Sequence, residues 1–253
     1  MRETRNQVET GVGFSRCVGP ADPGLCDMAN LSWQAKVLSV AGGVSAVLTI
    51  SAGGVRLGYV FMPLTTTLIL LLAVTATAAG ASRYKWSIVA GLVCSLAGDV
   101  FLMLPRDLFL AGLSAFLMAH LCYLMAFTSD SRLAAKPLAF LLWGAVGVCV
   151  VVGLWSRIPP ALQWPVALYA VAILCMAAQA ASRALTLRSL PATLAAAGAT
   201  LFVASDVLLA VRKFAGELPA SRLLVLGTYF SAQWLIAISL HPRARHPPSG
   251  THT

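Results

Sequence analysis

The chain has 253 residues, of which 58% are apolar and only 11% are charged. A soluble domain carries about 25% charged residues, and a mean hydropathy of +0.82 leaves too little polar surface to coat a water-soluble globule. The composition therefore predicts an integral membrane protein and argues against a soluble enzyme or a nucleic-acid module. The net charge of +9 is spread along the chain, as expected for Lys and Arg in loops at a membrane surface.

Both ends of the chain are polar. Residues 1–30 contain no apolar core of a signal peptide, and we expect them to form a disordered extension, with Met28 as an alternative start. Residues 242–253 are rich in Pro, Arg and His and are expected to form a disordered tail. Residues 31–241 between them are expected to form one transmembrane domain.

Eight apolar runs divide this domain. Each is about as long as a membrane-spanning helix, which needs about 20 residues, and each is bounded by proline or by charged residues such as Arg183 with Arg188. In lipid a segment of this kind must satisfy its own backbone polar groups, so we expect an all-α, polytopic helix bundle. The runs are 34–54, 61–80, 86–104, 108–127, 137–155, 163–181, 191–211 and 221–240.

The loops differ in charge on the two sides of such a bundle. If all eight runs cross, the side that holds both termini carries twice as many Lys and Arg residues as the other side. The positive-inside rule then places both termini in the cytoplasm. We expect a multi-pass membrane protein, in the cell membrane if the source is bacterial.

Two acidic residues lie inside the apolar runs. Asp99 is in the third run, within Ser-Leu-Ala-Gly-Asp-Val-Phe-Leu-Met, and Asp206 is in the seventh, within Phe-Val-Ala-Ser-Asp-Val-Leu-Leu-Ala. A carboxylate at mid-helix costs at least about 2.5 kcal/mol to insert, so it is a functional candidate by default. Both runs ascend from the same side, and each acid precedes the next polar boundary by six residues. If the two helices pack together, the carboxyls can face one cavity.

Further polar and small residues share faces with these acids. Within the fourth run His120 lies one turn from Phe116 and three residues before Tyr123, and in the eighth Tyr229 and Gln233 are four residues apart. These side chains are expected to line the same pocket, although interhelical hydrogen bonds explain His120 and Gln233 equally well. In the third and seventh runs, residues of this kind recur every four positions: Gly91, Ser95 and Asp99, then Gly198, Phe202 and Asp206.

The two halves of the chain also contain similar short sequence motifs. Gly-Asp-Val-Phe-Leu from Gly98 is similar to Ser-Asp-Val-Leu-Leu from Ser205. His120 and Tyr229 follow their respective acids at nearly equal spacing. Runs one to four and five to eight therefore suit parallel four-helix repeats, because an even number of spans preserves orientation.

The two acidic motifs carry a resemblance to a known family. The segment around Asp99, followed by Phe-Leu-Ala-Gly-Leu-Ser-Ala-Phe-Leu-Met-Ala-His-Leu-Cys-Tyr from Phe109, resembles the first signature of the lysoplasmalogenase (YhhN-like) membrane family. The segment around Asp206, with Thr-Tyr-Phe-Ser-Ala-Gln from Thr228, resembles the second. The resemblance covers about 34–240 and implies about eight spans. This chain departs from the family in having Met62-Pro63 where Lys-Pro is frequent, which leaves head-group preference open.

The resemblance also implies an activity, namely hydrolysis of the vinyl-ether bond of a lysoplasmalogen to a fatty aldehyde and a glycerophospho-head group. The substrate would be a lysophospholipid within the bilayer, and no metal or cofactor is implied. This reaction needs a proton donor and a group that stabilises a cation, and paired carboxyls sharing one proton supply both. We therefore expect Asp99 and Asp206 to be catalytic, with their roles not assigned.

The remaining candidates support these two acids. We expect His120, Tyr123, Tyr229 and Gln233 to orient the carboxyls or the glycerol hydroxyl, and His120 is also a candidate proton shuttle. Two serines, Ser95 and Ser205, are expected to satisfy the acids rather than act as nucleophiles, because no Gly-x-Ser-x-Gly motif is present. At the far side, two arginines either extend to the interface or attract the lipid phosphate: Arg106 and Arg212.

Two other classes of protein fit part of the pattern. A proton-coupled transporter of small molecules or lipids would also place paired acids and repeats within the membrane. A non-catalytic lipid-binding or assembly protein would use the acids only to join helices. Release of aldehyde by the purified protein favours the enzyme, whereas proton-dependent uptake into vesicles favours the transporter.

Overall fold

The computed structural model describes residues 33–51, 55–76, 82–104, 108–216 and 219–241. Within these ranges the chain is all-α, as predicted, and the expected terminal extensions lie outside them. The α-helices are α2 (Trp33–Ser51), α3 (Val55–Thr75), α4 (Ser82–Met103), α5 (Phe109–Phe127), α6 (Pro137–Leu154), α7 (Pro160–Leu187), α8 (Leu190–Phe214) and α9 (Ser221–Ile238), and the 3-10 turn η1 (Trp155–Arg157) follows α6.

Six of these described helices, α4 to α9, are long and apolar enough to cross a membrane, and a shorter apolar helix covers Tyr59–Thr75 within α3. Many large apolar side chains on α6 and α7 point outward, including Leu141, Val152, Trp164 and Leu168. A continuous apolar exterior of this kind is stable only against lipid. The protein is therefore a multi-pass membrane protein.

Prolines account for several helix boundaries. Pro137 and Pro160 occupy the first positions of α6 and α7, where proline loses no helical hydrogen bond and its fixed φ angle suits the helix. The expected boundary at Arg183 is wrong, because α7 continues to Leu187 and contains Arg183 as a buried residue. Its charge is neutralised within the bundle rather than in a loop.

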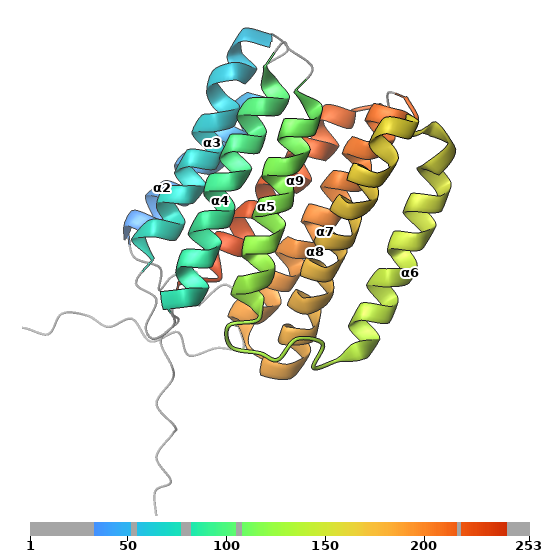
Figure 1. The fold of residues 1–253 in the computed structure, drawn as a ribbon. Helices are drawn as coiled ribbons and strands as arrows, with labels where there is room; N and C mark the ends of the chain where they lie inside the picture. The colour runs from blue at the N-terminus through green and yellow to red at the C-terminus, as the bar shows by residue number, and fades with distance from the viewer. Residues whose placement is uncertain (1–32, 52–54, 77–81, 105–107, 217–218, 242–253) are drawn as a thin grey trace, which may run out of the picture. The chain divides into compact units, whose positions relative to one another are not determined.

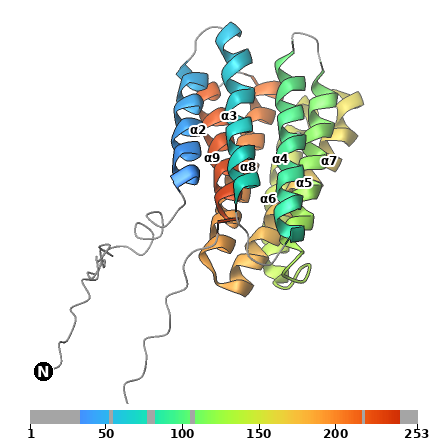
Figure 2. The ribbon, with the colours of Figure 1, turned by 90° about the vertical axis from the view of Figure 1, so that its left-hand side faces the viewer.

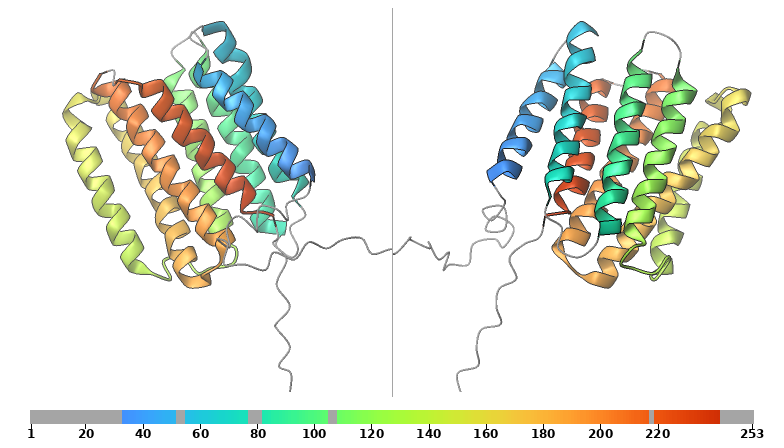
Figure 3. Two further views of the ribbon diagram at one scale, coloured as in Figure 1. Left: turned by 180° about the vertical axis from the view of Figure 1, so that it is seen from behind. Right: turned by 60° about the vertical axis from the view of Figure 1, so that its left-hand side comes forward.

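Helices that are neighbours in the chain form the most extensive pairs, namely α4 with α5, α8 with α9, and α2 with α3. Figure 1 shows α6 at the edge of the bundle beside α7. The pair α2–α3 lies against α9 (Figure 2), and α9 runs between α8 and that pair (Figure 3). Helix α9 therefore connects the two halves of the bundle.

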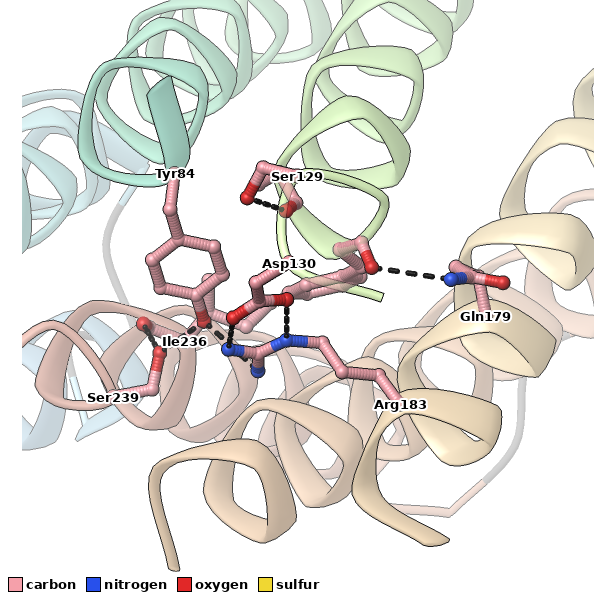
Figure 4. A network of polar contacts seen from close by, with 9 residues as sticks. Tyr84, Ser129, Asp130, Gln179, Arg183, Ile236 and Ser239 are labelled. Carbon is pink, nitrogen blue, oxygen red and sulfur yellow. Dashed lines mark hydrogen bonds and ion pairs between the residues drawn. The ribbon is translucent and has the colours of Figure 1, made fainter. Parts of the chain in front are cut away.

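A polar network joins four segments at the end of the bundle where α5 and α7 finish (Figure 4). Arg183 of α7 donates two hydrogen bonds, of 2.7 and 2.6 Å, to the Asp130 carboxylate after α5. Its guanidinium carbon lies 4.5 Å from the ring centroid of Tyr84 on α4, whose hydroxyl is 2.9 Å from Ser239 Oγ after α9. Gln179 Nε2 donates to the carbonyl of Phe127, at the end of α5. The network closes this end of the bundle.

Candidate active site

Asp99 lies about one turn before the end of α4, and its side chain is fully buried. Its Oδ2 accepts a 2.5 Å hydrogen bond from Thr66 Oγ1 of α3. Its Oδ1 is buried with no hydrogen-bond partner among the described residues, although the Tyr229 hydroxyl of α9 interacts with the carboxyl electrostatically. Helices α3, α4 and α9 thus meet around this group.

Asp206 lies about two turns before the end of α8 and is 16% exposed. Its Oδ2 accepts a hydrogen bond from the Tyr169 hydroxyl of α7 and lies 3.5 Å from His120 Nε2 of α5. The Tyr169 hydroxyl is in turn 2.9 Å from His120 Nε2. Three helices therefore meet at this acid as well.

Both carboxyls line one cavity of about 350 Å³. Within the described residues α4 and α8 are not among the helix pairs in extensive backbone contact, so the two acids line one cavity without close packing of their helices. They are instead joined through α5, since Phe116 of α5 lies 6.3 Å, centroid to centroid, from Phe202 of α8. Other polar side chains at the cavity belong to Tyr59, Ser205, Arg212, Arg222 and Tyr229.

An apolar groove meets this cavity at Asp206. The groove lies between α5, α6, α7 and α8, and aliphatic side chains such as Val150, Leu154 and Ile173 form much of its wall. Four residues line both spaces: Leu102, Phe116, Asp206 and Leu209. One carboxyl therefore lies where a cavity that contains several polar side chains meets a groove that is almost entirely apolar.

A buried chain of hydrogen bonds supports the cavity from α5 and α9. The Tyr123 hydroxyl donates to Gln233 Oε1 at 2.7 Å, and Gln233 Nε2 donates to the Tyr229 hydroxyl at 3.2 Å. Ser95 Oγ lies 3.5 Å from the Tyr123 hydroxyl. The chain can form because α4 has glycine at 91, where a Cβ would lie 2.3 Å from the Tyr123 ring.

The structure brings together part of the predicted set of site residues. Of these candidates Ser205, Arg212 and Tyr229 line the cavity with both acids, although the Ser205 hydroxyl donates to the Val225 carbonyl at 3.0 Å. His120 lies next to Asp206, and not next to Asp99, the acid of the same predicted four-helix repeat. Three candidates stand behind the cavity as the buried chain, namely Ser95, Tyr123 and Gln233. Arg106 lies outside the described residues.

Three residues at the site were not anticipated. Thr66 and Tyr169 donate to the two acids, and Arg222 lines the cavity beside Arg212. Thr and Tyr are common within apolar helices, so the sequence does not identify either residue as part of the site. Their contacts with the acids are seen only in the packed helix bundle. Among the described residues, no group of three or more His, Cys, Asp or Glu side chains is placed to hold a metal ion.

Fold and site together define a multi-pass membrane helix bundle with two carboxyls at one cavity. The chain belongs to the YhhN family, which matches residues 57–240, and the resemblance of its two motifs is thereby confirmed. It is 31% identical over 186 residues to the "Uncharacterized membrane protein YhhN" of Escherichia coli, covering 72% of this chain and 86% of that protein.

Relatives with a named activity are similar at the same level. The "Lysoplasmalogenase TMEM86B" of Sus scrofa is 33% identical over 188 residues, which cover 74% of this chain and 76% of that protein. The "Lysoplasmalogenase" of Mycobacterium bovis is 33% identical over 174 residues, which cover 66% of this chain and 64% of that protein. No solved structure matches the chain.

Proposed function

We propose that this protein hydrolyses the vinyl-ether bond of lysoplasmalogens. The observation that carries the proposal is a cavity with two carboxyls that continues, at Asp206, into an apolar groove. A lysoplasmalogen has a polar head group, one apolar chain and the vinyl ether at the junction between them. The two spaces match this division, and relatives named lysoplasmalogenase support the same substrate class.

The two carboxyls supply the chemistry of the reaction. One donates a proton to the alkene carbon distal to the ether oxygen, and an oxocarbenium ion results. The other carboxylate stabilises this cation and then takes a proton from the attacking water, which yields a hemiacetal. Collapse of the hemiacetal breaks the bond to the glycerol oxygen and releases the aldehyde.

The arginines at the cavity are suited to hold the head group. Arg212 and Arg222 both line the cavity, and guanidinium groups bind phosphate oxygens in a fixed, often bidentate geometry. Met62 lines the same cavity, at the position where the family frequently has lysine. We assign phosphate recognition to the two arginines.

The membrane topology forms part of the proposal. We propose that all eight helices cross the membrane, with both termini in the cytoplasm, as two parallel four-helix repeats. The packing supports the repeats, because α5 packs against α7 as α9 packs against α3. The acids support them as well, since Thr66 of α3 donates to Asp99 and Tyr169 of α7 donates to Asp206.

The test compares two substrates with purified protein in detergent. A vinyl-ether lysolipid is expected to release aldehyde, whereas the alkyl-ether analogue of equal chain length is expected to remain intact. Asp99→Asn and Asp206→Asn should each lower kcat by about 10²- to 10⁴-fold, the range for one general acid or base.

Two results would contradict this function. Near-normal turnover by both Asn variants would show that the two acids do not take part in catalysis. Absence of aldehyde release, combined with proton-dependent uptake into vesicles, would instead identify a transporter. Thermal melting of each variant serves as the control for folding.

A further inference from the structure

The hydrogen-bond pattern around Asp206 specifies where the protons lie. A tyrosine hydroxyl has one hydrogen, and that of Tyr169 is donated to Asp206. Tyr169 Oη must then accept from His120 Nε2, which lies 2.9 Å away, so the histidine carries its proton on Nε2. Its Nδ1 is buried without a hydrogen-bond partner among the described residues, and a proton there would lack an acceptor. Asp206 therefore accepts the Tyr169 O–H, lies 3.5 Å from the His120 Nε2–H, and is 16% exposed, which together suit a carboxylate.

Asp99 is more deeply buried than Asp206. It is fully buried, Oδ2 accepts a hydrogen bond from Thr66, and the Tyr229 hydroxyl also interacts with the carboxyl. Oδ1 lies buried without a hydrogen-bond partner among the described residues. An ionised carboxylate has about four acceptor sites and is costly to bury unless they are filled. A protonated carboxyl needs fewer donors, and Asp99 lines the cavity where the substrate would bind.

We propose that Asp99 is the proton donor and Asp206 the carboxylate that stabilises the cation, with Tyr169 as its positioning residue and His120 holding Tyr169. This inference rests on the proposed hydrolysis. Among the residues that the structure describes, the other ionisable groups that line the cavity are Tyr59 of α3, Arg212 of α8, and Arg222 and Tyr229 of α9. Arg212 lies near the last residue of α8 and Arg222 near the first residue of α9. The head group would bind between them.

The assignment gives a cycle in which every proton is accounted for. The Asp99 O–H bond breaks as the alkene electron pair forms a new C–H bond, and the cation develops beside Asp206. Water adds to this cation and gives one proton to Asp206. In the collapse, Asp206 returns that proton to the departing glycerol oxygen, and Asp99 takes the proton of the hemiacetal hydroxyl. Both acids regain their starting states, and one water is consumed.

The first test measures charge rather than turnover. The probe is a lysolipid in which a protonated secondary amine replaces the ether oxygen, compared with the neutral alkyl ether of the same length. The wild-type protein is expected to bind the amine more tightly than the ether. Asp206→Asn should lose at least tenfold of that preference, whereas Asp99→Asn, its isosteric control, should keep it. Loss in Asp99→Asn, equal loss in both variants or loss in neither would overturn the assignment.

The second test concerns Tyr169 and His120. Tyr169→Phe should lower kcat about tenfold or more with little change in KM, because the carboxylate loses its donor. His120→Gln keeps an N–H donor in place of Nε2 and should remain within a few-fold of wild type, whereas His120→Leu should fall as Tyr169→Phe does. Equal inactivity of the Gln and Leu variants would make His120 a proton carrier and overturn the positioning role, as would a normal kcat for Tyr169→Phe.

The two levels of proposal can fail separately. If the wild-type protein releases no aldehyde but only Asp206→Asn loses the preference for the amine, the hydrolysis is wrong and the charge assignment stands. If aldehyde is released and both Asn variants keep the preference, the hydrolysis stands and the division of roles is wrong.

Discussion

Asp206 lines both the cavity and the apolar groove, and the proposed function places the junction between the head group and the chain of a lysolipid there. Its partners come from α5 and α7, whereas those of Asp99 come from α3 and α9. The sequence alone shows each acid inside an apolar run, where the cost of a charge in lipid makes the acid a functional candidate. The sequence does not mark Thr66 and Tyr169 as candidates, because hydroxyl side chains enter apolar helices at little cost.

The groove predicts an effect on chain length. Ala210 lines it one turn beyond Asp206, and Ala210→Phe should narrow it. We expect KM for a long-chain vinyl-ether lysolipid to rise about tenfold, with little change for a short-chain homologue. Steady-state kinetics on both substrates measure this. Ala197→Phe, at an exposed position of the same helix, is the control, and an equal effect of both variants on both substrates would contradict the prediction.

At the scale of helices, glycine decides how closely the pairs around the site pack. A Cβ at Gly98 of α4 would lie 2.6 Å from the Phe116 ring of α5, and one at Gly198 of α8 would lie 2.8 Å from the Ala232 carbonyl oxygen of α9. Small residues of this kind allow helices to approach in a membrane, where no hydrophobic force draws them together. The glycines thereby hold Phe116 and Tyr229 at the cavity.

Gly198→Ala should destabilise the protein by about 1–3 kcal/mol, because the new Cβ meets backbone that cannot move aside easily. The melting temperature in detergent and the aldehyde-release rate should both fall. Gly227→Ala on α9 is the matched control, since a Cβ there meets no atom within 4 Å. Equal melting temperatures for the two variants would show that α8 and α9 do not pack as described.

The network at the other end of the bundle makes an asymmetric prediction. Arg183 is 5% exposed and Asp130 is 36% exposed. Removing Asp130 therefore leaves a buried positive charge without its carboxylate, whereas removing Arg183 leaves a carboxylate that water can reach. Asp130→Ala should destabilise by about 2 kcal/mol, somewhat less than for a fully buried pair. Arg183→Met should destabilise less. The melting temperatures of the two variants measure this difference. A larger loss of stability in Arg183→Met than in Asp130→Ala would contradict the buried position of Arg183.

At the scale of the whole molecule, the charge distribution and the proposed crossing of all eight described helices together predict the orientation. Ala135 precedes α6 and Ser156 follows it, and both are exposed. They therefore mark opposite ends of one span. The positive-inside rule predicts that Ala135 lies on the cytoplasmic side.

Thiol labelling in intact bacterial cells measures this orientation. In a variant whose native cysteines are replaced, Ser156→Cys should react with a membrane-impermeant reagent added outside. Ala135→Cys should react only after permeabilisation. The opposite pattern would reverse the topology, and labelling of both sites from outside would show that α6 does not cross.

The amino-acid sequence by itself determined the class of protein, the approximate helical segments and the presence of two acids within them. Each of these follows from a local quantity: the transfer free energy of a run of residues into lipid, or of one charge within it. The tertiary structure decided which helices surround each acid, that Arg183 is buried against Asp130, and that the cavity continues into a groove. These features depend on the rotation and close packing of helices far apart in the chain, which no single segment encodes.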